Sequence, residues 1–289
     1  MQHEISLGEI SAVIDEHGGR LCSFKVAAKE YLWDGDDYER RRASTNIFPF
    51  YGALTALAQK QLNMRESMGR YGIIADVDLF VEEKGQDYIS LCFRSNETTK
   101  KSYPFDFLYK VEFRIIGMRL AVSYEVQNHS ERDMFFACAG SVCVSLPLGA
   151  ENTRDVYDVE FLYDSSPELI ELSKDGYNIG TSPYKLLYGH KLRLDEKFPV
   201  NEDILLNGLP PRISILSPKG GNIFRLRSQG MNYTQFNLGQ QNGQGNMLVT
   251  VSTTQPPKDK KTKISEMDDI IKLPKNESFF IECSFTVEQ

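Results

Sequence analysis

In the middle of the chain, hydrophobic and polar residues alternate with the two-residue period of β-strands. The pattern predicts three successive strands, from Phe107 to Ile115, from Leu120 to Val126 and from Met134 to Leu146. In the second strand, four apolar side chains share one face: Leu120, Val122, Tyr124 and Val126. Successive strand residues point to opposite faces, so this alternation predicts a strand with one buried face.

The third of these segments is apolar or small on both faces, and Gly140, Ser141, Val142 and Cys143 lie within it. Small side chains deep in a sheet leave room for something else, which is either a packed neighbour or a bound molecule. Composition alone favours the packed neighbour. The resemblance described below favours the bound molecule.

Short strand patterns recur from Ile10 to the last apolar stretch, Phe279 to Val287, and no segment of convincing length has a helical period. No boundary linker or internal repeat interrupts them. We therefore predict an all-β fold, a single large antiparallel β-sandwich that forms one domain over residues 1–289.

Three segments fit this strand pattern poorly. Asn46 to Leu57 is apolar but contains Pro49 and Gly52, which favours an irregular buried segment. Asp175 to Lys197 indicates mainly loop with short strands. Thr253 to Asp269 is polar and rich in Pro and Lys, so we expect a mobile loop there.

Charge and composition exclude several classes of protein. The net charge is −7, with 41% hydrophobic and 25% charged residues, which is ordinary for a globular protein and argues against nucleic-acid binding. The sequence shows no secretory signal and no apolar run near the roughly 20 residues that span a bilayer. Its five cysteines are scattered, so we expect reduced, buried thiols in a cytoplasmic protein without membrane association.

Common catalytic and cofactor motifs are missing from the sequence. The four histidines are dispersed, and no pair of Cys and His has the spacing of metal ligands. Gly243 and Gly245 precede no predicted helix, so no phosphate-binding loop is indicated. We expect neither a metal nor a cofactor.

Eight short segments nevertheless occur in a familiar order along nearly the whole chain. They are Tyr31-Leu32-Trp33, Ile47-Phe48-Pro49 with Gly52, Tyr71 to Asp76, Tyr103-Pro104-Phe105-Asp106-Phe107, Val126-Gln127-Asn128, Ala139 to Pro147, Asp203-Ile204-Leu205, and Leu273 to Phe279. This order resembles that of the aldose 1-epimerase (galactose mutarotase-like) family, particularly its shorter bacterial branch. The resemblance implies a β-sandwich with a carbohydrate cleft over one sheet.

The family interconverts the α and β anomers of an aldose, with a glutamate as base and a histidine as acid. On this chain the two histidine positions of the family fall on Tyr71 and Ser141, the glutamate position falls near Ser252, and a nearby arginine position falls on Ala75. A serine hydroxyl is neutral near pH 7 and is no base without an activating partner. The resemblance therefore implies an epimerase-like protein that is weak or inactive as an isomerase, and the catalytic residues stay unassigned.

Binding needs only a concave site with a few well-placed polar groups. We predict a small-molecule carbohydrate as ligand, contacted by Asn46, Tyr71, Ser141, Asp203 and Ser252. Trp33 and Tyr233 are candidates for stacking on a sugar face.

These residues also have purely structural interpretations, such as packing for Tyr71 and Trp33 or turn capping for Asp203. Two other classes of function stay open. One is a non-catalytic sugar-sensing or partner-binding module. The other is a different isomerase or lyase that uses carboxylates from other strands.

Overall fold

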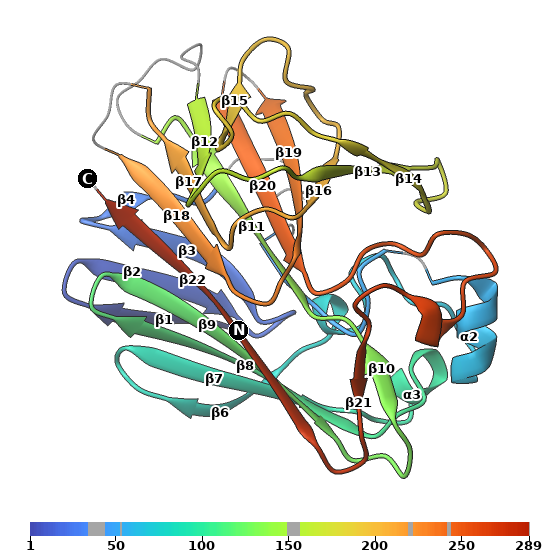
Figure 1. Cartoon of the computed structure of the whole chain (residues 1–289). Helices are drawn as coiled ribbons and strands as arrows, with labels where there is room; N and C mark the ends of the chain where they lie inside the picture. Colours follow the sequence, from blue (N-terminus) through green and yellow to red (C-terminus); the bar gives the residue numbers. More distant parts are fainter. Residues whose placement is uncertain (34–43, 53, 149–156, 219–221, 242–243, 289) are drawn as a thin grey trace.

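The described strands form two large antiparallel sheets and two small ones (Figure 1). The structure is a computed structural model, and it describes residues 1–33, 44–52, 54–148, 157–218, 222–241 and 244–288. Every pairing between named strands is antiparallel. The all-β fold class predicted from the sequence is therefore confirmed.

One large sheet has seven strands. In spatial order they are β14 (Asn178–Pro183), β13 (Glu168–Leu172), β16 (Ile204–Asn207), β19 (Tyr233–Gln241), β20 (Gln244–Ser252), β11 (Ala139–Leu146) and β5 (Asn46–Ile47). The other has nine strands. They are β15 (Lys191–Leu194), β12 (Tyr157–Phe161), β17 (Arg212–Leu216), β18 (Ile223–Ser228), β22 (Ser278–Glu288), β9 (Arg119–Asn128), β8 (Phe107–Ile116), β7 (Tyr88–Arg94) and β6 (Phe80–Lys84).

The small sheets and the short helices complete the fold. The N-terminal sheet contains β1 (Gln2–Leu7), β2 (Ile10–Asp15), β3 (Arg20–Val26) and β4 (Lys29–Glu30), and the two-stranded sheet contains β10 (Met134–Phe136) and β21 (Ile271–Leu273). The helices are α2 (Ala56–Leu62), α3 (Thr99–Ser102) and the 3₁₀ turns η1 (Ile74–Asp76) and η2 (Ile264–Glu266). No described helix is long and apolar enough to cross a membrane.

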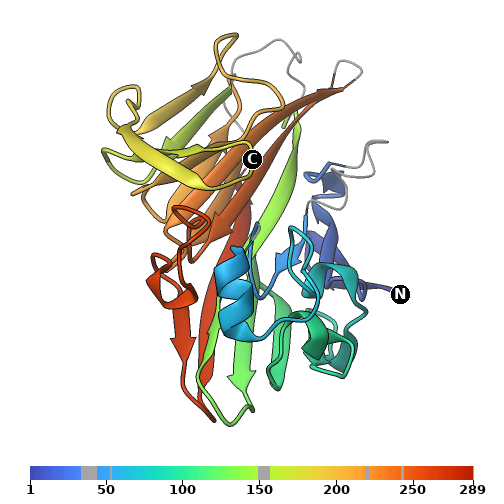
Figure 2. The same cartoon turned by 90° about the vertical axis from the view of Figure 1, so that its right-hand side faces the viewer.

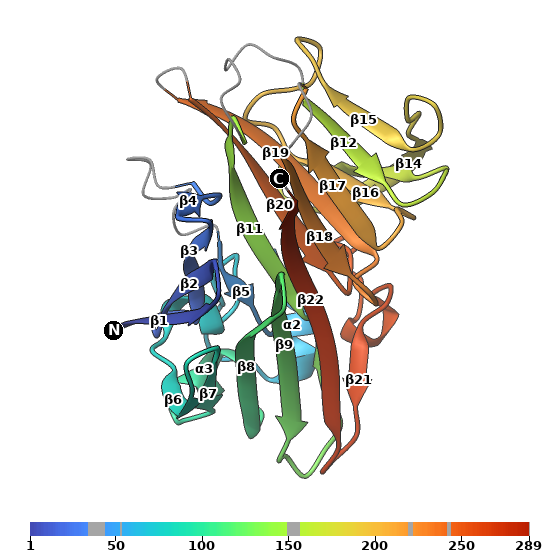
Figure 3. The same ribbon diagram turned by 90° about the vertical axis from the view of Figure 1, so that its left-hand side faces the viewer.

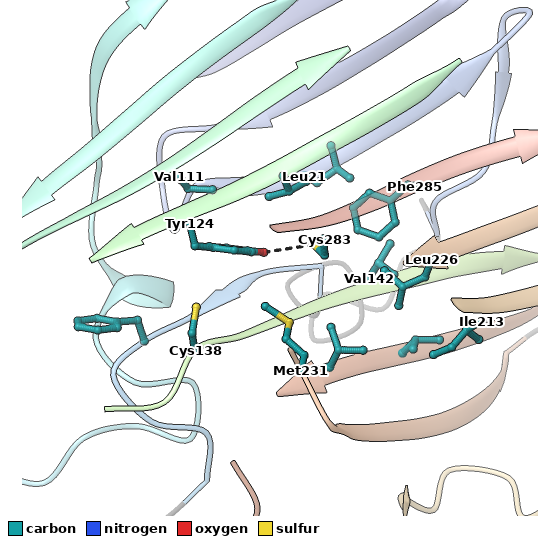
Figure 4. Close-up of a cluster of buried hydrophobic side chains, with 14 of the residues drawn as sticks. Leu21, Val111, Tyr124, Cys138, Val142, Ile213, Leu226, Met231, Cys283 and Phe285 are labelled. Carbon is teal, nitrogen blue, oxygen red and sulfur yellow. Dashed lines mark hydrogen bonds between the residues drawn. The ribbon is translucent and has the colours of Figure 1, made fainter. Parts of the chain in front are cut away.

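Apolar side chains from both large sheets meet in one buried core. Figure 4 shows Val142 of β11 facing Leu226 of β18 and Phe285 of β22. The rings of Phe161 on β12 and Phe236 on β19 meet edge to face across the same layer, with centroids 6.4 Å apart. The β9 side chains predicted to share a buried face, from Leu120 to Val126, are all buried, which confirms that reading of the alternation.

The third predicted strand is two strands that belong to different sheets. β10 pairs with β21, whereas β11 pairs with β20 and β5. At Gly140, an added Cβ would lie 2.6 Å from the Tyr124 hydroxyl oxygen. A packed neighbour therefore occupies the space beside this glycine, and the bound molecule expected there is not required.

The segment around α2 corrects two predictions. The Thr55 Oγ1 accepts a hydrogen bond from the Ala58 N–H at 2.9 Å and so caps a helix that the sequence pattern did not predict. The stretch predicted as a mobile loop instead contains η2, which packs beside α2 with Ile264 buried (Figures 1 and 2). Thr55 Oγ1 donates to the Thr262 carbonyl at 2.9 Å and joins the two segments.

All five cysteines are free thiols. Three of them, Cys138, Cys143 and Cys283, are buried as predicted, but Cys22 is exposed and the prediction is wrong for it. Burial raises the pKa of Cys283 to about 12, so this thiol stays protonated at neutral pH. It lies against the Tyr124 hydroxyl (Figure 4).

Candidate functional site

A cavity of about 530 Å³ lies beside strands β13, β16 and β19 of the seven-stranded sheet. Its lining consists of Tyr51, Gly52, Met68, Arg70, Leu172, Ser173, Lys174, Asp175, Gly176, Asp203, Gln235 and Pro256. We call it the Arg70 cavity. Aromatic, apolar and charged groups share its wall, as in pockets that bind polar small molecules.

Two loop segments are hydrogen-bonded together so that Tyr51 and Arg70 meet. The Ile73 N–H donates to the Phe48 carbonyl at 2.7 Å, and the Gly52 N–H donates to the Arg70 carbonyl at 2.8 Å. Gly72 makes this approach possible, because it has a φ of +75° and an added Cβ would lie 2.2 Å from the Phe48 oxygen.

Arg70 is the centre of a hydrogen-bond network in the cavity. Its Nη2 donates to Asp203 Oδ2 at 3.0 Å and to the Tyr51 hydroxyl at 3.3 Å. The Tyr51 hydroxyl donates to Gln235 Oε1 at 3.0 Å, and Asn237 Nδ2 donates to Asp203 Oδ1 at 2.8 Å. Both oxygens of the carboxylate are thus held, which fixes its orientation.

The rings of Tyr51 and Tyr71 also contact the Arg70 guanidinium. The Tyr51 and Tyr71 rings are stacked, with centroids 6.2 Å apart and planes 22° apart. The Arg70 guanidinium carbon lies 5.7 Å from the Tyr51 centroid and 6.0 Å from the Tyr71 centroid, within the range of cation–π attraction. The network therefore combines a fixed cation, a fixed anion and an aromatic surface.

Burial and charge set the protonation of the two central groups. Burial raises the pKa of Tyr51, and the positive charge of Arg70 offsets only part of that effect. Burial alone would lower the pKa of Arg70, but its contacts with Tyr51, Tyr71 and Asp203 outweigh it, so the pKa is raised. At neutral pH Tyr51 is therefore a hydrogen-bond donor and Arg70 a permanent cation.

The structure places three predicted site residues on or near the cavity. Asp203 lines it, directly before β16. Tyr71 does not line it but stacks on Tyr51, which does. Ser141 is the register partner of Thr250, and Thr250 is the register partner of Gln235, so all three share one face of the sheet. With strands about 4.8 Å apart, Ser141 lies about 10 Å from Gln235.

Two other predicted residues make internal hydrogen bonds and do not line the cavity. Asn46 is buried, and its side chain donates to the Gly18 carbonyl at 3.1 Å and the Gly19 carbonyl at 2.5 Å. Ser252 is buried, and its hydroxyl donates to the Thr254 carbonyl at 2.9 Å.

The aromatic residues suggested for stacking are buried as well. Trp33 is 5% exposed and Tyr233 is 3% exposed, and neither lines the cavity. Trp33 is therefore a packed residue, as its structural interpretation predicts, and neither ring is placed to stack on a ligand in this cavity. Tyr51 and Tyr71 form the aromatic pair at the cavity instead. Ala75, at the arginine position of the family, is buried in η1.

The described lining of the cavity contains no histidine. The ring of His17 bonds to Asp78 at 2.8 Å, and that of His190 bonds to Asp164 at 2.9 Å, both outside the lining. Asp175 and Asp203 are the carboxylates among the lining residues that the structure describes. Among the described residues, no group of three or more His, Cys, Asp or Glu side chains is placed to hold a metal ion.

The sequence patterns did not identify four residues of the cavity network as site residues: Tyr51, Arg70, Gln235 and Asn237. Arg70 directly precedes the segment whose resemblance to the family identified Tyr71, so its position was a usable signal. Gln235 and Asn237 alternate with the apolar residues Phe236 and Leu238 on β19, but this pattern does not tell which strand approaches Asp203.

Comparison with known proteins identifies the fold. No family model and no curated protein matches the chain. A galactose mutarotase-like protein from Lactobacillus casei superimposes with a TM-score of 0.88 at 19% identity over 100% of both chains. A galactose mutarotase related enzyme from Lactobacillus acidophilus gives 0.86 at 19% identity, covering 100% of this chain and 98% of the other.

More distant structures agree. The aldose epimerase homologue from C. elegans superimposes with a TM-score of 0.74 at 12% identity, covering 100% of this chain and 99% of the other. The chain therefore has the galactose mutarotase-like fold, as the resemblance implied.

Proposed function

We propose that this chain is an aldose 1-epimerase-like protein that binds a carbohydrate in the Arg70 cavity and is weak or inactive as an anomer-interconverting isomerase. The observation that carries the proposal is the Arg70–Asp203 pair, held by Tyr51 and Asn237 in the wall of the cavity. A guanidinium donates and a carboxylate accepts, so together they match the adjacent hydroxyl groups of a sugar.

The protonation chemistry supports binding rather than rapid catalysis. Ring opening of an aldose needs a base at the C1 hydroxyl and an acid at the ring oxygen. In the cavity, both Asp203 oxygens accept protein hydrogen bonds, and Asp175 forms an ion pair with Lys260 at 3.2 Å. Tyr51 holds its proton tightly because burial raises its pKa. No pair with opposed proton-transfer tasks is present among these groups.

The free cysteines support a reducing compartment, so we also propose a cytoplasmic location.

The test measures anomer exchange and binding on the same protein. NMR exchange spectroscopy on several aldoses, at catalytic protein concentration, is expected to give a rate close to that of buffer. Titration of the same aldoses is expected to show saturable binding. A fast anomer exchange would contradict the inactive assignment, and the absence of binding for every aldose would contradict the carbohydrate site.

Asp203→Ala is the diagnostic variant, because it removes the acceptor of the network. Asp164→Ala is its control, since Asp164 also pairs with a basic side chain but lies outside the cavity. We expect the first to weaken binding roughly tenfold or more and the second to leave it unchanged. Saturable binding with an exchange rate indistinguishable from buffer would favour the sugar-sensing module, whereas slow exchange that is measurably above buffer would favour a weak isomerase.

A further inference from the structure

β21 and β22 are joined by one short turn but belong to different sheets. β21 pairs with β10, and β22 pairs with β9. Figures 1 and 3 show the two strands rising from the shared turn and separating. Antiparallel strands joined by a short turn usually pair with each other, so this separation leaves two strand edges facing one another.

The first half of β22 has a strand on one side only. From Cys283 onward it pairs with β18 on one side and β9 on the other. β18 ends at Ser228, which is the partner of Cys283, so Ser278 to Glu282 pair with β9 alone. No other described strand pairs with these five residues. Such an edge is a template for a further strand.

A cavity of about 680 Å³ lies along this edge. Its lining includes four successive β22 residues, Phe279 to Glu282, together with Ile270 and Ile271 at the start of β21. Side chains of a strand alternate between faces, so a cavity over one face would touch only every second residue. Four in succession place the cavity beside the strand edge. We call it the β21–β22 groove.

The groove has apolar walls, two arginines (Arg119 and Arg227) and two carboxylates (Asp269 and Glu282). Phe280 is 67% exposed and lines the groove with Ile270, Ile271 and Ile281, so it belongs to an apolar patch and is not a single scattered residue. Arg227 lines the groove and is the register partner of Arg212, and like charges directly opposite on a sheet are unfavourable. Neither arginine forms an ion pair with a described residue, whereas Arg119, also in the lining, pairs with Glu282 at 3.3 Å. An anionic group beside Arg227 would relieve this repulsion.

We propose that the β21–β22 groove binds an extended segment of a partner protein as an added strand beside β22. Main-chain hydrogen bonds to the free edge supply affinity, and alternate apolar side chains pack on Phe280 and Ile270. An acidic side chain of the segment faces Arg227. A second copy of this chain is a poorer occupant, because each copy carries a net charge of −7 and the two repel.

The experiment selects linear octapeptides from a displayed random library on the full chain, with counter-selection on the double variant F280S/R227E. Enriched peptides are expected to alternate apolar residues and to carry at least one Asp or Glu. Synthetic versions are expected to slow amide hydrogen exchange at residues 278–282. N-methylation of their backbone should abolish binding, because it removes the main-chain donors.

Single variants test the two walls. Phe280→Ser and Arg227→Glu should each weaken the selected peptides roughly tenfold. Phe80→Ser is the matched control, since Phe80 is 69% exposed on β6, and it should leave affinity unchanged. Three results would overturn the proposal: no enrichment over the double variant, protection confined to another surface, or a dimer in light scattering that Phe280→Ser dissociates.

Discussion

Arg70 donates a hydrogen bond to the Asp203 carboxylate at 3.0 Å, across 133 positions of the sequence. Both side chains remain partly exposed, at 55% for Arg70 and 31% for Asp203. An exposed ion pair contributes little to the free energy of unfolding, about 1 kcal/mol or less. Its position in the cavity wall therefore suggests a role in binding rather than in folding.

Replacement of Arg70 by Ala tests this separation of roles. We expect Arg70→Ala to lower the free energy of unfolding by about 1 kcal/mol or less, and to weaken carbohydrate binding roughly tenfold. Urea denaturation and calorimetric titration measure the two effects. Arg193→Ala is the matched control, because Arg193 is 51% exposed and pairs with Asp158 outside the cavity. Equal losses of affinity in both variants would remove Arg70 from the site.

Gly72 is expected to be intolerant of any side chain. Gly72→Ala places a Cβ 2.2 Å from the Phe48 carbonyl oxygen in a backbone with positive φ, so the Tyr51 and Arg70 segments must separate. We expect a loss of about 2–4 kcal/mol in the free energy of unfolding.

The control for this variant is Gly117→Ala, where φ is +60° but nothing lies within 4 Å of the added Cβ. Backbone strain alone then costs about 1–2 kcal/mol. Chemical denaturation compares the two variants. Equal losses in the free energy of unfolding would mean that the close approach of Gly72 to Phe48 does not contribute to stability.

Thr55, the N-cap residue of α2, is expected to stabilise the η2 segment as well as the helix that it caps. Thr55→Ala removes the acceptor for the Ala58 N–H and the donor to the Thr262 carbonyl, and the Thr55 side chain is fully buried. We expect a loss of about 1–3 kcal/mol, with faster hydrogen exchange around η2. Thr98→Ala should have almost no effect, since Thr98 occupies the N-cap of α3 without a side-chain cap bond.

Stability is expected to fall in alkaline solution. Burial raises the pKa of Tyr103, Tyr109 and Tyr124 well above 10, whereas in the unfolded chain each titrates near 10. Above about pH 10 the folded state therefore binds more protons, and the free energy of unfolding drops by about 1.4 kcal/mol per pH unit for each such tyrosine. Urea denaturation between pH 8 and pH 11 measures the slope.

Tyr109 allows the effect of burial on tyrosine ionisation to be measured separately from the loss of a hydrogen bond. The Tyr109 hydroxyl is buried without a hydrogen-bond partner among the described residues, whereas the Tyr103 hydroxyl donates to the Phe135 carbonyl at 2.8 Å. Tyr109→Phe should leave stability at pH 7 unchanged or higher and reduce the alkaline slope by one proton. Tyr103→Phe should lose about 1 kcal/mol at pH 7, because the hydrogen bond to the Phe135 carbonyl is lost. An unchanged slope for Tyr109→Phe would contradict the burial argument.

Alternation of apolar and polar residues was enough to predict the fold class and the buried face of β9, because the period of a strand is local. It was not enough to separate β10 from β11, since a continuous apolar run does not tell which sheet each half joins. Nor did it reveal α2, whose 7 residues make too few turns for a helical period to show.

The order of short segments along the chain predicted the galactose mutarotase-like fold and placed Asp203 and Tyr71 in the region of the cavity. The tertiary structure alone decided that Arg70, Tyr51 and Gln235 join them, and that Asn46 and Ser252 have their side chains engaged elsewhere. The physical reason is that a hydrogen-bond network is defined by distances through space. Residues that meet across 133 positions leave no periodic trace in the sequence between them.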